Sequence, residues 1–107
     1  GQTGWGNHWD QGVMPNRILN DIERQMRRTG FEQTKEQIAR TAVRGNRITS
    51  RQLRQLLYEF NFESTRLSFA KWAYPYVVDP ERIHLIFDAF TFESSISNFD
   101  RFLYRGR

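Results

Sequence analysis

The chain has 107 residues and no cysteine, so it fits one domain with a modest core, and disulfides and thiolate metal sites are excluded. It is 38% hydrophobic and 15% aromatic, too rich in large apolar side chains for a disordered chain, and its net charge is +4. No apolar run reaches the roughly 18 residues that a membrane-spanning helix needs.

The start of the chain is rich in glycine, with Gly1, Gly4, Gly6 and Gly12 among polar residues. This composition predicts a flexible lead-in over residues 1–14, followed by a single domain over residues 15–105. Two tryptophans, Trp5 and Trp9, lie in the lead-in. Three roles stay open for them: a hydrophobic lid folded back on the domain, part of a disordered tail, or a ligand-stacking surface.

Two helices are predicted in the first half of the domain. Pro15 suits a first helical turn, and Gly30 stops the first helix. Residues 33–44 form the second, and Gly45-Asn46 is predicted to end it with left-handed backbone. The apolar residues of both recur at helical spacing: Ile18, Leu19, Ile22 and Met26 in the first, and Ile38, Ala39, Ala42 and Val43 in the second.

Four more helices are predicted after residue 48. Thr49 and Gln52 have the spacing of a capping box, in which each side chain pairs with the other residue's backbone N–H. Pro75 ends the next helix, and Asp79-Pro80 is predicted to cap and start the one after it. Their apolar stripes are Leu53, Leu56, Leu57 and Phe60, then Leu67, Ala70, Ala73 and Tyr74, then Ile83, Ile86, Phe87 and Phe90, then Ile96, Phe99, Phe102 and Leu103.

A short motif recurs along the chain. Phe60-Asn61-Phe62-Glu63-Ser64 returns as Phe90-Thr91-Phe92-Glu93-Ser94, and a weaker copy contains Phe31-Glu32. The spacing from Phe31 to Phe62 is 31 residues and from Phe62 to Phe92 is 30. This period predicts an all-α fold of about six short helices stacked as a helical-repeat array. The predicted core includes Phe60, Phe62, Leu67, Ala70, Phe87, Phe90 and Phe92.

These residues resemble the bacterial family called domain of unknown function 4476, whose members contain repeated Phe-x-Phe-Glu-x-x-Lys/Arg-Leu-x-x-Ala-Lys units. The second copy carries the resemblance most fully, through Phe60, Phe62, Glu63, Arg66, Leu67, Ala70 and Lys71. The first copy departs from it, with Thr29 in place of Phe60 and Glu36 in place of Leu67. The resemblance implies a helical domain often attached to exported bacterial proteins, and it assigns no catalytic residue.

The sequence offers no positive sign of an enzyme, a cofactor or a metal site. His8 and His84 have no companions at ligand spacing, and no phosphate-binding loop or nucleophile motif is present. Glu63 and Glu93 are interpreted as first-turn carboxylates that offset the helix dipole. The Phe of each Phe-Glu-Ser copy is interpreted as a hydrophobic staple rather than as a binding signature.

The arginines are the residues that most suggest a binding surface. Of 16 cations 14 are Arg, and residues 15–55 hold ten cations against four acids. Arg24, Arg27, Arg28 and Arg51 form the candidate anion or partner surface, because Arg can grip carboxylate or phosphate bidentately. A solvated face, an acidic protein partner and nucleic acid are the three alternatives. Nearby acids and the absence of a known reader motif disfavour nucleic acid.

The sequence therefore predicts a non-catalytic, monomeric helical domain that serves as a protein-interaction or accessory module. Its partner stays unknown, and an exported location is suggested by the family resemblance alone. The alternative function is nucleic-acid or polyanion binding through the Arg-rich first half. The surface distribution of Arg separates the two, because one continuous patch favours polyanions and Arg paired with acids favours a protein partner.

Overall fold

The computed structural model describes residues 12–105. This part of the chain contains five α-helices and two 3₁₀ helices, with no strand and only two isolated β-bridges. The all-α prediction is confirmed. In chain order the helices are α2 (Asn16–Arg28), α3 (Glu32–Gly45), α4 (Ser50–Leu57), α5 (Glu63–Ala73), η1 (Tyr74–Tyr76), η2 (Pro80–Ala89) and α6 (Glu93–Arg105).

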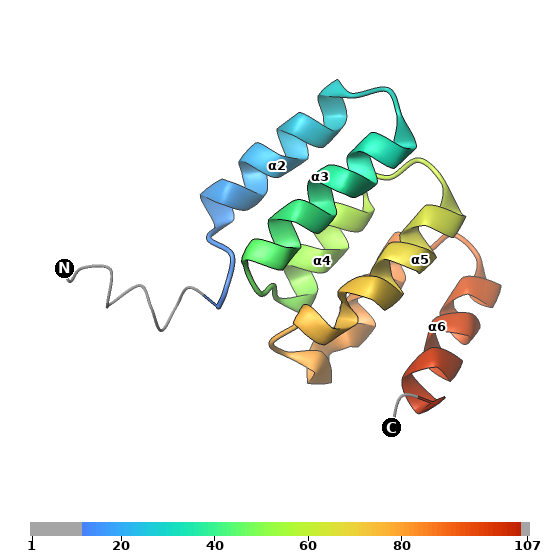
Figure 1. Ribbon diagram of the computed structural model, residues 1–107. Helices are drawn as coiled ribbons and strands as arrows, with labels where there is room; N and C mark the ends of the chain where they lie inside the picture. Colours follow the sequence, from blue (N-terminus) through green and yellow to red (C-terminus); the bar gives the residue numbers. More distant parts are fainter. Residues whose placement is uncertain (1–11, 106–107) are drawn as a thin grey trace.

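The helices form two rows. α3, α5 and α6 pack in sequence, α3 on α5 and α5 on α6, and run in the same direction side by side (Figure 1). α2 packs on α3, and α4 packs on both α5 and η2. As a result, the loops that precede α3, α5 and α6 all lie along one edge of the domain, at the upper right of Figure 1.

The opposite edge is held by backbone hydrogen bonds between the segments that precede α2, α4 and η2. The N–H of Met14 donates to Arg47 O at 2.7 Å, and the N–H of Ile48 donates to Tyr76 O at 3.0 Å. Met14 is only 2% exposed, so the packed domain includes a residue that the sequence assigned to the lead-in. The rest of that lead-in, with Trp5 and Trp9, lies outside the described residues.

The helix punctuation is partly as predicted. The capping box of Thr49 and Gln52 is present at the start of α4. Asp79 was predicted to cap its own helix, but its side chain makes no such bond. It instead accepts a hydrogen bond from the N–H of Ser50 at 2.7 Å and so caps α4 from across the fold. Gly45 and Asn46 do not adopt left-handed backbone; Asn46 is extended, and its side chain donates to Ala42 O.

The helix after Pro80 is a 3₁₀ helix rather than an α-helix. Its buried residues are Ile83, Ile86 and Ala89, which are spaced three positions apart. A 3₁₀ helix has three residues per turn, so this spacing places all three side chains on one face. That face packs on α4.

The predicted core is right for five residues and wrong for two. Phe60, Ala70 and Phe90 are buried, and Leu67 and Phe87 pack partly buried against the core. Phe62 and Phe92 are instead 59% and 57% exposed. The chain bends at the residue before each of them, and this bend separates the buried first Phe of each motif from the exposed second Phe.

Candidate functional site

Two of the four predicted surface arginines, Arg24 and Arg27, are paired with carboxylates. Arg24 pairs with Asp21 on the same helix. Arg27 binds Glu59 through two nitrogens, with Nε and Nη2 each 3.1 Å from a carboxylate oxygen, and lies 3.9 Å from Glu23. Arg28 and Arg51 form no ion pair with any described residue.

The charge of Glu59 raises the pKa values of two neighbouring groups, Arg27 and Glu23. The hydrogen bond and charge of Glu59 raise the pKa of Arg27 above its ordinary value. Burial raises the pKa of Glu23, the charge of Glu59 raises it further, and the charge of Arg27 partly offsets both. Arg27 therefore stabilises two neighbouring carboxylates rather than presenting a free cation.

Other arginines are also engaged within the fold. The guanidinium groups of Arg40 and Arg44 lie 5.3 and 5.4 Å from the centre of the Trp72 ring, within cation–π range. Arg40 also binds Glu36, and Arg54 binds Asp88. Part of the positive charge of the first half is thus engaged in contacts of α2, α3 and α4 with acidic or aromatic side chains.

First-turn glutamates of α3 and α5 each bind the loop that precedes the next helix in the row. The carboxylate of Glu32 in α3 accepts from the N–H groups of Asn61 and Phe62 at 3.0 to 3.1 Å. The carboxylate of Glu63 in α5 accepts from Thr91 and Phe92 at the same distances. These bonds satisfy backbone donors near the starts of α5 and α6 that have no partner within the helix.

The pKa of Glu63 reflects this arrangement. Burial raises it, but the amide hydrogen bonds from Phe92 and Thr91, together with the Ser95 hydroxyl and the charge of Arg66, lower it by more, so the net pKa is below its ordinary value. Hydrogen bonds to a carboxylate favour its charged form in this way. Glu63 is therefore a structural clamp held in its ionised form.

A cation one turn further along makes a second link. Lys35 Nζ donates to Glu59 O at 2.9 Å. Arg66 donates to Ala89 O at 2.7 Å and to Phe60 O at 2.8 Å. Both cations bind carbonyls near the end of the helix in the next unit, where backbone acceptors lack intrahelical partners. Sequence reasoning did not find these links, although Lys35 and Arg66 share the same position in the repeat.

Three exposed phenylalanines lie along the edge where α3, α5 and α6 begin. Phe31, Phe62 and Phe92 are 73%, 59% and 57% exposed, and we call them together the Phe edge. Glu32, next to Phe31, holds the backbone of Phe62, and Glu63, next to Phe62, holds the backbone of Phe92. The three aromatic residues therefore follow one another in a row. Phe31 and Phe62 are themselves the N-cap residues of α3 and α5, whereas a staple uses the residue before the N-cap, so the staple interpretation is wrong.

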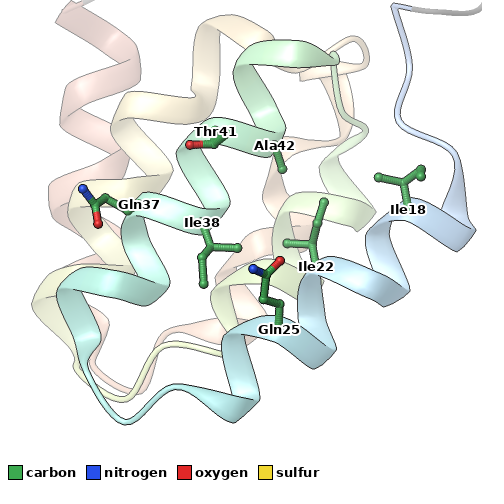
Figure 2. Close-up of a pocket in the computed structure, with 7 residues that line it drawn as sticks. All are labelled: Ile18, Ile22, Gln25, Gln37, Ile38, Thr41 and Ala42. Atoms are coloured by element: carbon green, nitrogen blue, oxygen red, sulfur yellow. The ribbon is translucent and has the colours of Figure 1, made fainter.

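A groove runs between α2 and α3, with a volume of about 530 Å³. Ile22 and Gln25 of α2 point toward Ile38 and Ala42 of α3 across it, as Figure 2 shows. Ile18 extends the apolar lining at one end, and Gln37 and Thr41 lie along the margin. We call this the first groove.

Residues 12–105 hold no cluster of three or more side chains suited to bind a metal ion. His84 is exposed on η2, and His8 lies outside the described residues. Within the same part of the chain, none of the helices combines the length and the apolar character needed to cross a bilayer.

The fold and these surfaces define an all-α domain of two helix rows, with inter-unit clamps and two exposed apolar surfaces. The chain belongs to the family described as a domain of unknown function (DUF4476), which it matches over residues 13–103. The predicted family is therefore confirmed. Searches of curated proteins and of solved structures returned no match.

Proposed function

We propose that this domain is a non-catalytic protein-interaction module that binds its partner through the Phe edge. The observation that carries the proposal is the exposure of Phe31, Phe62 and Phe92, each of which directly precedes one of the three neighbouring helices α3, α5 and α6. Exposed aromatic side chains that cluster on one surface are typical of protein interfaces. An exported bacterial context is part of the proposal and rests on the family resemblance alone.

The state of the charged groups supports the same proposal. Arg24 and Arg27 are paired with carboxylates, which is the distribution that favours a protein partner over a polyanion. Glu63, one of the two glutamates that the sequence places in a first helical turn, is occupied by the backbone N–H groups of Thr91 and Phe92. A carboxylate engaged in this way is poorly placed to accept a proton from a substrate.

Site-specific photo-crosslinking tests the proposal. The photoreactive residue p-benzoylphenylalanine replaces Phe62 in one variant and Tyr104 in a control, because Tyr104 is 82% exposed on α6 away from the Phe edge. In an extract of the native bacterium, we expect one protein to crosslink at position 62 and not at position 104. The captured protein is then purified, and its affinity for the domain is measured by calorimetry.

A triple variant completes the test. Replacing Phe31, Phe62 and Phe92 by Ser should abolish binding of the captured protein and leave the melting temperature nearly unchanged, because the three side chains are exposed. The same affinity for the triple variant as for the natural sequence would reject the Phe edge as the binding surface.

A further inference from the structure

The first groove is open because the unit that contains it has no helix packed on its outer side among residues 12–105. The equivalent positions in the next unit lie 31 residues later: Ile22, Gln25, Ile38 and Ala42 correspond to Leu53, Leu56, Phe69 and Ala73. Those four residues are fully buried. Of the four residues in the first unit, only Ile22 is buried, and Gln25 is exposed.

Helix α3 covers the equivalent groove of the second unit. Its face of Lys35, Ala39 and Val43 is buried. Lys35 reaches Glu59 O, two residues after the end of α4, and α3 places Arg40 and Arg44 over Trp72 of α5. These contacts place α3 across both helices of the second unit.

Helix α5 covers the third unit in the same way. Arg66 reaches Ala89 O at the end of η2, and Ala70 is fully buried. Tyr74 packs edge-on against Phe99 and Phe102 of α6. Two successive grooves are thus each filled by a helix from the unit before.

The two covering helices share one pattern of contact residues. In α3 it is Glu32, Lys35, Ala39 and Val43, and in α5 with its C-cap residue it is Glu63, Arg66, Ala70 and Tyr74. In both, the later residues follow the Glu by three, seven and eleven positions, which lie on one face of a helix. The Glu clamps two loop amides, the cation reaches a helix-end carbonyl, and the Ala allows close approach.

The first unit offers what such a helix needs. The amides equivalent to Asn61 and Phe62 belong to Gly30 and Phe31, and Phe31 N–H has only a long contact of 3.4 Å to the hydroxyl of Thr29. Ile22, Ile38 and Ala42 form the apolar floor.

We propose that the first groove binds a partner α-helix carrying Glu, Lys or Arg, Ala, and Val or Tyr at positions i, i+3, i+7 and i+11. The site continues the packing that α3 and α5 make within the chain, and it shares only the backbone of Phe31 with the proposed Phe-edge interface.

The chain itself does not supply this helix. In α6 the corresponding residues are Glu93, Ile96, Asp100 and Tyr104, so a second copy would bring the carboxylate of Asp100 against the isoleucines of the groove. Burying an unpaired carboxylate is strongly unfavourable. Residues 1–11 contain no Glu, Lys or Arg, so they lack the first two residues of the pattern.

A peptide of residues 30–45 is the probe, because it carries Glu32, Lys35, Ala39 and Val43. Gln33→Lys and Gln37→Glu are joined by a lactam bridge, since an isolated helix of this length is otherwise barely populated. The peptide is labelled with fluorescein, and its anisotropy is followed as the full chain is added. We expect saturable binding with a Kd below about 1 mM.

Matched variants locate the binding. In the full chain, Ala42→Arg should weaken binding roughly tenfold or more by filling the groove, and Thr41→Arg at its margin gives a second variant if Ala42→Arg lowers the melting temperature. Ser97→Arg, exposed on α6, adds the same charge elsewhere and should change the Kd less than about twofold. In the peptide, Ala39→Asp should also weaken binding roughly tenfold or more.

Other outcomes overturn the proposal. The proposal fails if peptide binding does not saturate at about 1 mM of the full chain, or if both groove variants bind the peptide with an unchanged Kd. A roughly tenfold tighter Kd for a Trp5→Ala, Trp9→Ala chain would show that the chain's own start occupies the groove. A dimer seen by sedimentation that Ala42→Arg abolishes would assign the groove to a second copy. Phe62→Ser with Phe92→Ser should leave peptide binding unchanged, which separates this test from that of the Phe edge.

Discussion

The side-chain carboxylate of Glu63 accepts a hydrogen bond from the backbone N–H of Phe92 at 3.0 Å. The contact joins the start of α5 to the start of α6, 29 residues apart in sequence, and Glu32 makes the same contact with Phe62. The same geometry therefore occurs at two glutamates 31 residues apart, and each links the start of its helix to the start of the next helix in the row. Its immediate neighbour, the repeated phenylalanine, is left exposed on the Phe edge.

The first prediction concerns this clamp. Glu63→Gln should lower the free energy of unfolding by about 1 kcal/mol, because a charge-assisted hydrogen bond to two amides becomes a neutral one. Glu93→Gln is the matched control. Glu93 has the same place in α6 as Glu63 has in α5, but its carboxylate accepts no loop amide among residues 12–105. Urea unfolding measures both, and equal losses would contradict the clamp role.

The second prediction concerns pH. The pKa of Glu63 is lowered on folding, so the unfolded chain binds its proton more tightly. The stabilisation from Glu63 should be complete above about pH 5 and should be lost as the pH falls from the ordinary Glu pKa near 4.3 through the lower folded value. The natural chain and Glu63→Gln should therefore differ in stability at neutral pH and converge in acid. A difference that grows on acidification would mean that the pKa of Glu63 is raised.

Glu23 requires the comparison to be made between these two chains rather than on the natural chain alone. Burial raises its pKa, so its contribution to stability has the opposite sign and falls as the pH rises through the folded value. Because both chains keep Glu23, this contribution cancels in the difference.

The third prediction concerns the close approach of helices at Ala70. This residue is fully buried, and Ala70→Leu should cost about 1 to 3 kcal/mol of stability by overpacking. Ala42→Leu is the control, because Ala42 is only half-buried at the open first groove and should change stability by less than about 0.5 kcal/mol. Thermal unfolding compares the two. A neutral Ala70→Leu would contradict the close packing of α5 on the third unit.

The sequence predicted what depends on local pattern and missed what depends on partners far along the chain. The apolar stripes and the capping box of Thr49 are local, and the structure has them. Asp79 was predicted to cap its own helix, yet it caps α4. The fold brings Asp79 next to Ser50, which lies 29 residues earlier in the sequence. Propensity alone does not encode such a partner.

The interaction surfaces show the same limit. Phe60 and Phe62 look alike in sequence, and both were predicted to be buried. The bend at Asn61, held by Glu32, turns the second one outward. The first groove was not predicted at all, although the replacement of Leu56 and Trp72 by Gln25 and Thr41 in the first unit was a readable sign that this unit is packed differently.

The last prediction concerns the alternative function, polyanion binding through Arg24, Arg27, Arg28 and Arg51. A protein that neutralises several phosphates releases counterions, so its retention on heparin persists to high salt and falls steeply as salt rises. Because Arg24 and Arg27 are already paired, we expect the domain to elute early. Replacing all four by Gln should move elution to lower salt. The shift should be no larger than in a control variant in which Gln replaces Arg17, Arg82, Arg101 and Arg105. In unfolding measurements, Arg27→Gln should lower the melting temperature more than Arg24→Gln, because it leaves Glu23 and Glu59 without their cation. Late elution that only the first quadruple variant removes would favour the polyanion function over the protein-interaction one.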